Sequence, residues 1–348
     1  MIINQISSGN AKRKYNIFLA ILRAYLALNI INIHFLRTPP PILMNKYIIR
    51  IIRNNLPIHT FFLMSFYFSH KLFLSKNIEK IKKRFERLLI PYLSWPIIIW
   101  ILNNFLYYTF KLNFKLSLNE LKIQLMTGHC FMSVLWFHYN LIFATLLIII
   151  IIFLSSNYFV LIMLNLCIFA FYFQYSNLNY KIFSKYSLYK KFTFGRFSEI
   201  LPSCIIGFII PSLHSLIILR KYRIYSIYFL LLIFLFLIKY NVFIYINGFY
   251  YQGIGLVVKS SLFFLIVLLK KKKKINNKYI VNIIKIITSY TSGIYFLHTN
   301  VEMFMGNSIK LIKKKTFSGS IIIYIISYFI SLIGAKIVGN NKFSCLFQ

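Results

Sequence analysis

Runs of apolar residues, most of them close to 20 residues long and separated by short polar stretches, dominate the chain. A helix needs about 20 mostly apolar residues to cross the hydrocarbon core of a bilayer. The gaps between the runs are mostly short, so the pattern predicts an all-α, polytopic integral membrane bundle. On this criterion we expect about ten transmembrane helices, at residues 17–35, 56–74, 88–110, 137–154, 157–175, 199–217, 225–245, 253–269, 280–304 and 321–338.

The predicted spans form one membrane domain over residues 17–338, with an N-terminal tail at 1–16 and a C-terminal tail at 339–348. The N-terminal tail has no short apolar core followed by a small-residue cleavage site, so we expect no cleaved signal peptide. Loop cations are more numerous on the side of the N-terminus. This bias predicts a cytoplasmic N-terminus.

Composition agrees with a membrane protein, since 59% of the 348 residues are hydrophobic. The chain has 41 Lys and Arg against five acidic residues, giving a net charge of +36. The cations lie in short stretches such as "KNIEKIKKRFER", between apolar spans, which favours loops lying against anionic lipid headgroups. They do not gather on one soluble domain, so we expect no nucleic-acid partner. Five carboxylates also disfavour a paired-carboxylate glycosidase.

The sequence lacks the common motifs for other chemistry. It contains no P-loop, no H-E-x-x-H and no G-x-S-x-G. No C-x-x-C occurs either, so we expect no disulfide framework and no metal site. The cysteines are scattered, at Cys130, Cys167, Cys204 and Cys345.

Arg23 and His34 are ionisable residues inside the first predicted span, "ILRAYLALNIINIHF" (21–35). Eleven residues of α-helix make three turns plus about 20°, so both positions lie on nearly one face, about 16 Å apart along the axis. An ionisable residue within a membrane indicates a functional site by default. The alternative is that Arg23 snorkels to the cytoplasmic surface and His34 lies among the outer headgroups. The spacing alone leaves both interpretations open.

Further motifs occur in a fixed order along the chain. Arg84 and Arg87 form an R-x-x-R pair in "KKRFERLLIPYLSWP" (82–96), directly before a span. With the Arg-x10-His pair on the first helix, this pattern resembles the acyltransferase 3 family, multi-span membrane O-acyltransferases that modify sugars. The resemblance extends from the first to the ninth predicted span through "FFLMSFYF" (61–68), "GHCFMSVLWFHYNLI" (128–142), "EILPSCIIGFII" (199–210) and "SYTSGIYFLHTNV" (289–301).

The resemblance implies transfer of an acyl group, usually acetyl, from acyl-CoA to a hydroxyl of a glycan or glycolipid. It implies that His34 is the general base, a role suited to neutral imidazole near pH 7. Arg84 and Arg87 would bind the donor phosphates, since guanidinium groups match phosphate oxygens; the alternative for this pair is ordinary positive-inside anchoring. Arg23 would bind the donor or stabilise charge on the attacked carbonyl.

The same resemblance suggests substrate-binding residues. Tyr295 and His298 lie in a matched motif and are candidates to line the cavity. Glu302, four positions after His298, is interpreted as a capping carboxylate at an exit loop, with a partner of the imidazole as the alternative. Trp136 belongs to a matched Leu-Trp-Phe segment, although a tryptophan near a span end is also typical of an interfacial belt. The other histidines, His138 among them, are interpreted as packed or interfacial.

The chain departs from the family pattern at two positions. Phe66 follows Ser65 where glycine is expected, which removes a site of close backbone approach. Ala20 stands where an acidic residue often precedes the first-helix arginine. Two alternatives therefore stay beside the acyltransferase: a transporter or flippase whose intramembrane cations bind an anionic or glycan substrate, and a catalytically inactive relative.

Overall fold

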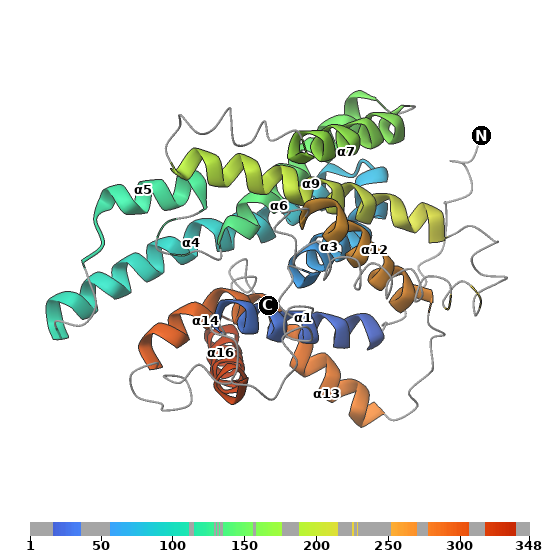
Figure 1. Ribbon diagram of the computed structural model, residues 1–348. Helices are drawn as coiled ribbons and strands as arrows, with labels where there is room; N and C mark the ends of the chain where they lie inside the picture. The colour runs from blue at the N-terminus through green and yellow to red at the C-terminus, as the bar shows by residue number, and fades with distance from the viewer. Residues whose placement is uncertain are drawn as a thin grey trace, which may run out of the picture.

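Every regular element described in this protein is helical (Figure 1). The computed structural model describes residues 17–35, 56–110, 115–128, 130, 132, 135–155, 158–175, 188–214, 225, 228, 252–269, 278–305 and 317–338. In chain order the helices are α1 (Ile17–Phe35), α3 (Leu56–Leu74), α4 (Ile78–Phe110), α5 (Leu118–Thr127), α6 (Trp136–Leu154), α7 (Phe159–Tyr175), α9 (Leu188–His214), α12 (Gln252–Leu269), α13 (Lys278–Ser289), α14 (Thr291–Met305) and α16 (Phe317–Val338).

The helices follow the predicted spans closely. Helices α1 and α3 have the predicted bounds, and α6, α7, α9, α12 and α16 overlap theirs. Helix α4 begins ten residues before the predicted 88–110, so Arg84 and Arg87 lie within it. The predicted span 225–245 falls outside the described residues except at 225 and 228, as do both predicted tails.

Three of the described helices are long and apolar enough to cross a membrane by length and composition. The expected all-α membrane fold is confirmed, whereas the expected number of about ten spans is not. Shorter apolar stretches lie in α1, α7, α9 and α12. The three membrane-capable segments are Ile78–Thr109, Trp136–Leu154 and Ser318–Val338.

Large apolar side chains remain exposed along the outer helices. Ile101 and Phe105 on α4 are more than half exposed, as are Ile168 on α7 and Phe329 and Ile333 on α16. In water such a surface would be costly, but hydrocarbon chains solvate it. These faces are therefore suited to contact lipid.

Helix α1 lies within the bundle and packs against α3, α12, α13, α14 and α16 (Figure 1). Its residues Leu22 and Leu26 are buried in a cluster with Leu63 of α3 and with Phe264 and Leu268 of α12. Because α1 is held on several sides, its position relative to the neighbouring helices is fixed by packing.

The most extensive helix–helix contact described is between α3 and α9, and Gly207 lets their backbones meet. A Cβ atom added at Gly207 would lie 2.5 Å from the carbonyl oxygen of Leu63 and 2.7 Å from its Cα. Only glycine allows the two backbones to approach this closely. The central glycine of the matched segment 199–210 is therefore a packing requirement.

Two buried histidines of α3 form hydrogen bonds across the same interface. His70 Nδ1 donates a hydrogen bond of 2.7 Å to the carbonyl oxygen of Phe208. His59 Nδ1 shares a hydrogen bond of 2.8 Å with Ser203 Oγ. Both imidazoles are more than 90% buried, so these bonds satisfy polar groups that have no access to water.

The predicted span 280–304 is divided into α13 and α14 by a turn at Tyr290. Thr288 Oγ1 donates to the carbonyl oxygen of Ile284, and Thr291 Oγ1 donates to that of Thr288, each at 2.8 Å. Threonine and serine hydroxyls compete with the helical backbone pattern in this way. The local sequence "TSYTSG" (288–293) concentrates such residues where the break occurs.

Gln124 organises the segment that leads into α6. It is fully buried near the end of α5. Its Oε1 accepts hydrogen bonds of 2.8 Å from the backbone N–H groups of Cys130 and Met132, and its Nε2 donates to the Met132 carbonyl. Gly128 ends α5 with φ +67°, a conformation that favours glycine. These contacts fix where α6 begins.

We expect Gly207→Ala to destabilise the protein by about 1–3 kcal/mol, because a methyl group at this position overlaps the Leu63 backbone. The loss of stability is measured by thermal unfolding in detergent, monitored by size-exclusion chromatography. An alanine variant that unfolds at the wild-type temperature would show that the two helices can separate without cost.

Candidate functional site

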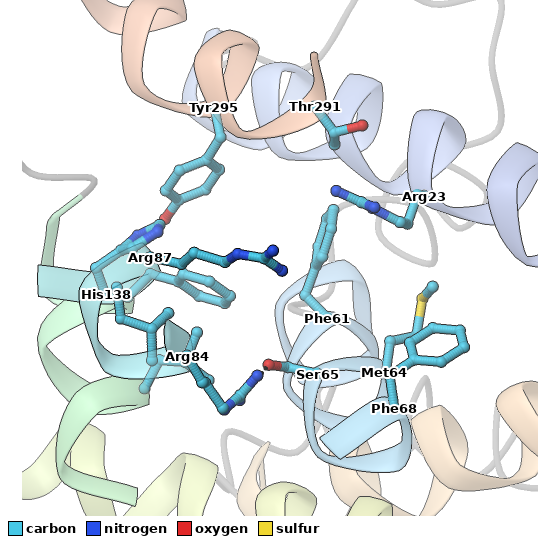
Figure 2. Close-up of a pocket in the computed structure, with 13 residues that line it drawn as sticks. Arg23, Phe61, Met64, Ser65, Phe68, Arg84, Arg87, His138, Thr291 and Tyr295 are labelled. Carbon is cyan, nitrogen blue, oxygen red and sulfur yellow. Dashed lines mark hydrogen bonds between the residues drawn. The ribbon is translucent and has the colours of Figure 1, made fainter. Parts of the chain in front are cut away.

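A pocket of about 590 Å³ lies where α1, α3, α4, α6 and α14 converge (Figure 2). These helices are far apart in the sequence, so tertiary packing creates the site. Its lining combines basic, aromatic, aliphatic and hydroxyl side chains: Arg23, Phe61, Met64, Ser65, Phe68, Arg84, Arg87, Leu88, Phe137, His138, Leu141, Thr291 and Tyr295.

The pocket is strongly basic. Three of the described residues that line it are arginines, and none of those described is acidic. Figure 2 shows the guanidinium groups of Arg23 and Arg87 directed from opposite sides toward the space beside the Phe61 ring. Guanidinium groups bind phosphate and carboxylate through paired, charge-assisted hydrogen bonds. The electrostatics of this pocket therefore favour an anionic ligand.

Arg84 is held in place by α3. Its Nη2 donates a hydrogen bond of 3.0 Å to Ser65 Oγ. Its guanidinium carbon lies 5.6 Å from the centroid of the Phe66 ring and 5.3 Å from that of Phe73. Both rings are fully buried, which strengthens the attraction between a cation and an aromatic face. Arg84 thus joins α4 to α3.

Phe66 is the residue found in place of the expected glycine. The side chain is fully buried, and its ring contacts both Arg84 and the ring of Phe73. Helix α3 therefore still has a close neighbour at this position, although the expected glycine is absent. Instead, the aromatic ring forms part of the surface on which the Arg84 guanidinium rests.

Arg87 differs from Arg84 although only three positions separate them. Its side chain is exposed, and its guanidinium makes no hydrogen bond or ion pair with the residues that the structure describes. Three helical positions are 60° short of a full turn, which is enough to turn one residue toward α3 and the other toward the pocket. Arg87 is the more available of the pair for a ligand.

Aromatic rings form another part of the wall. The centroids of Phe137 and Tyr295 lie 5.2 Å apart, and Phe137 also contacts Phe61 and Phe62. Tyr295 is 8% exposed and lines the pocket. These rings come from α3, α6 and α14, so they both connect the helices and give the pocket an apolar surface.

The structure brings together four of the seven predicted site residues: Arg23, Arg84, Arg87 and Tyr295 all line the pocket. Trp136 and His298 are buried beside it and are not among its lining residues. His298 Nδ1 donates a hydrogen bond of 2.7 Å to the Tyr295 carbonyl, which stabilises the helix turn carrying that tyrosine. The functional roles predicted for these residues stay predictions.

His34 is in α1, as predicted, but its side chain lies outside the described residues. Helix α1 runs without interruption from Ile17 to Phe35. The helical geometry assumed for positions 23 and 34 is therefore present, with the two about 20° apart around the axis.

Besides Ser65, which lies in a matched segment but was not selected as a site residue, the sequence interpretation missed two polar residues of the pocket, His138 and Thr291. Neither had a distinctive signal, since His138 is a single histidine at the start of an apolar run and Thr291 lies within a predicted span. His138 does follow the Leu-Trp-Phe segment directly. Its proximity to that segment was the available indication.

The described residues thus form an all-helical bundle whose basic pocket includes an R-x-x-R pair and an arginine of α1. The chain is a member of the acyltransferase 3 family, because the family model described as an acyltransferase domain matches residues 16–338. No curated protein and no solved structure matches the chain. Family membership makes this protein a membrane acyltransferase.

We expect Arg84 and Arg87 to respond differently to a charge-preserving substitution. Arg84→Lys keeps the charge but loses the planar group that contacts Ser65 and the two rings, so it should cost about 1.5–3 kcal/mol of stability. Arg87→Lys should leave the unfolding temperature unchanged. Thermal unfolding in detergent compares the two, and an equal loss of stability in both variants would contradict the assigned difference.

Proposed function

We propose that the protein transfers an acyl group, with acetyl as the expected group, from acyl-CoA to a hydroxyl of a glycan or glycolipid. The observation that carries this proposal is the pocket itself. Its described lining contains three guanidinium groups and no carboxylate, at the convergence of five helices. Coenzyme A carries several phosphates, which need such cations.

In this proposal Arg87 makes the main donor contact on α4. Its exposed guanidinium is directed into the pocket, whereas that of Arg84 is engaged with Ser65 and two rings. Arg84 lines the same pocket and adds positive potential there. Arg23 approaches from α1 and would contact the donor closer to its thioester.

The reaction then needs a base for the acceptor hydroxyl, whose own pKa is too high for it to ionise near pH 7. The acceptor oxygen forms a bond to the thioester carbonyl carbon while the hydroxyl proton moves to the His34 imidazole. The C–S bond then breaks, and the sulfur of coenzyme A takes that proton as the tetrahedral intermediate collapses. Arg23, about 16 Å from position 34 along α1, would bind the donor phosphates rather than the reacting carbonyl.

The arrangement of α1 supports this division of roles. Positions 23 and 34 are about 16 Å apart along a continuous helix. An extended pantetheine arm has a comparable length. A donor whose phosphates lie near Arg87 and Arg23 would thus extend along α1 toward position 34.

We expect Arg87→Ala to weaken binding of labelled coenzyme A about 10- to 100-fold, because a charge-assisted hydrogen bond is lost. Lys83→Ala is the matched control, since Lys83 is an exposed cation of the same helix that does not line the pocket. Equal, unchanged affinities in Arg87→Ala and wild type would contradict the donor site. Arg84→Ala is less informative here because that residue also joins two helices.

We also expect His34→Ala to reduce transfer from radiolabelled acetyl-CoA to glycan by about 10²–10⁴-fold, the contribution of a general base. Coenzyme A should still bind to this variant with wild-type affinity. The measurement is label recovered in alkali-labile esters of glycans. Wild-type transfer by His34→Ala would remove the imidazole from the mechanism, while movement of a glycan across the membrane without donor consumption would support a transporter.

A further inference from the structure

His138 lies on the pocket wall, directly after Phe137 near the start of α6. It is 8% exposed. Its ring centroid is 4.4 Å from that of Phe296 and 5.9 Å from that of Tyr295. The imidazole is therefore packed among aromatic rings, and it is one of the residues that line the pocket, beside Tyr295 (Figure 2).

This imidazole is also without a hydrogen bond. Its Nδ1 is buried and has no partner among the described residues, and no described residue bonds the other ring nitrogen, Nε2. Most buried polar groups in proteins are hydrogen-bonded, and an unsatisfied one is costly. The buried Nδ1 is out of reach of a ligand, so a molecule in the pocket can bond this ring only at Nε2, for which the described residues provide no partner.

Other buried histidines of the protein provide a comparison. His59 shares a hydrogen bond with Ser203, His70 donates to the Phe208 carbonyl, and His298 donates to the Tyr295 carbonyl. Each of these three has a partner within the helix bundle, and none of them lines the pocket. His138, in contrast, lines the pocket and has no hydrogen-bond partner among the described residues. This combination is unexpected for a residue that only packs.

The surroundings of His138 favour a neutral hydroxyl over an anion. The arginines of this pocket are suited to bind an anionic group, because each guanidinium can donate paired hydrogen bonds to it. The His138 ring is instead surrounded by Phe137, Tyr295 and Phe296. Aromatic rings with one well-placed polar group are typical of sites that orient an uncharged ligand, and they suit the apolar face of a sugar ring.

We propose that His138 is a substrate-binding residue that hydrogen-bonds a hydroxyl of the sugar acceptor through Nε2, while the rings of Phe137 and Tyr295 contact the sugar face. This inference rests on the proposed function, since it assigns the acceptor to the same pocket as the donor. It separates the pocket into a guanidinium part for donor phosphates and an imidazole–aromatic part for the acceptor. Removal of the hydrogen bond should affect acceptor use and leave donor binding unchanged.

The test uses three substitutions that separate hydrogen bonding at each imidazole nitrogen from the packing of the aromatic ring. His138→Gln carries an amide near the position of Nε2, His138→Asn carries one near Nδ1, and His138→Phe keeps only the ring. The purified full-length protein is given radiolabelled acetyl-CoA and n-octyl β-D-glucopyranoside as the acceptor probe. We expect His138→Phe and His138→Asn to raise the KM for the glucoside about tenfold or more, with His138→Gln closer to wild type. The KM for acetyl-CoA should be unchanged in all three variants.

Thermal unfolding distinguishes binding from packing. If His138 only packs, His138→Phe should preserve the glucoside KM and the unfolding temperature better than His138→Gln does, and that result would overturn the inference. An unchanged glucoside KM in His138→Phe and His138→Asn would also overturn it, as would a wild-type enzyme that consumes acetyl-CoA without using the glucoside. The proposed function fails separately, when wild-type protein neither binds nor consumes acetyl-CoA.

Discussion

The packing of α3 against α9 is the constraint on which the site depends. A glycine at position 207 lets the backbone of α9 meet the backbone of α3 at Leu63, and two buried histidines bond across the same interface. Helix α3 in turn supplies Phe61, Met64, Ser65 and Phe68 to the pocket. A shift of α3 would move a whole wall of the site, including the Ser65 hydroxyl that accepts the hydrogen bond from Arg84. Backbone contact at one residue therefore has consequences for ligand binding about one helical turn away.

The R-x-x-R pair shows how one motif can combine structure with function. Because the two arginines are three residues apart on one helix, their side chains point in directions that differ by 60° and face different surroundings. Arg84 is fixed by a hydrogen bond and two rings, and Arg87 projects into the pocket. A guanidinium that is already bonded costs little further ordering. Replacement of the expected glycine by Phe66 gives the fixed arginine one of its rings.

The sequence allowed much of the fold to be predicted, because apolar runs of membrane length have sharp polar edges. Helices α1 and α3 have the bounds that these edges predicted. Four of the predicted site residues also meet in one pocket, since ionisable residues in apolar spans are costly unless a cavity or partner receives them. The break at Tyr290 was not predicted because hydropathy averaged over a span hides a short cluster of hydroxyl residues. His138 was not selected because one histidine in an apolar run has the same pattern whether it packs or binds.

The turn between α13 and α14 has a consequence for the chemistry of the pocket. Interrupted helices persist at membrane depth where the irregular backbone is buried in protein or faces a hydrated cavity. Thr291, the first residue of α14, lines the pocket, so the interruption is adjacent to space that solvent can occupy. Under the proposed function, a thioester that extends along α1 from this pocket would meet such solvent, and hydrolysis would compete for the acyl group. An acceptor that displaces this solvent before the donor reacts would protect the donor from wasteful loss.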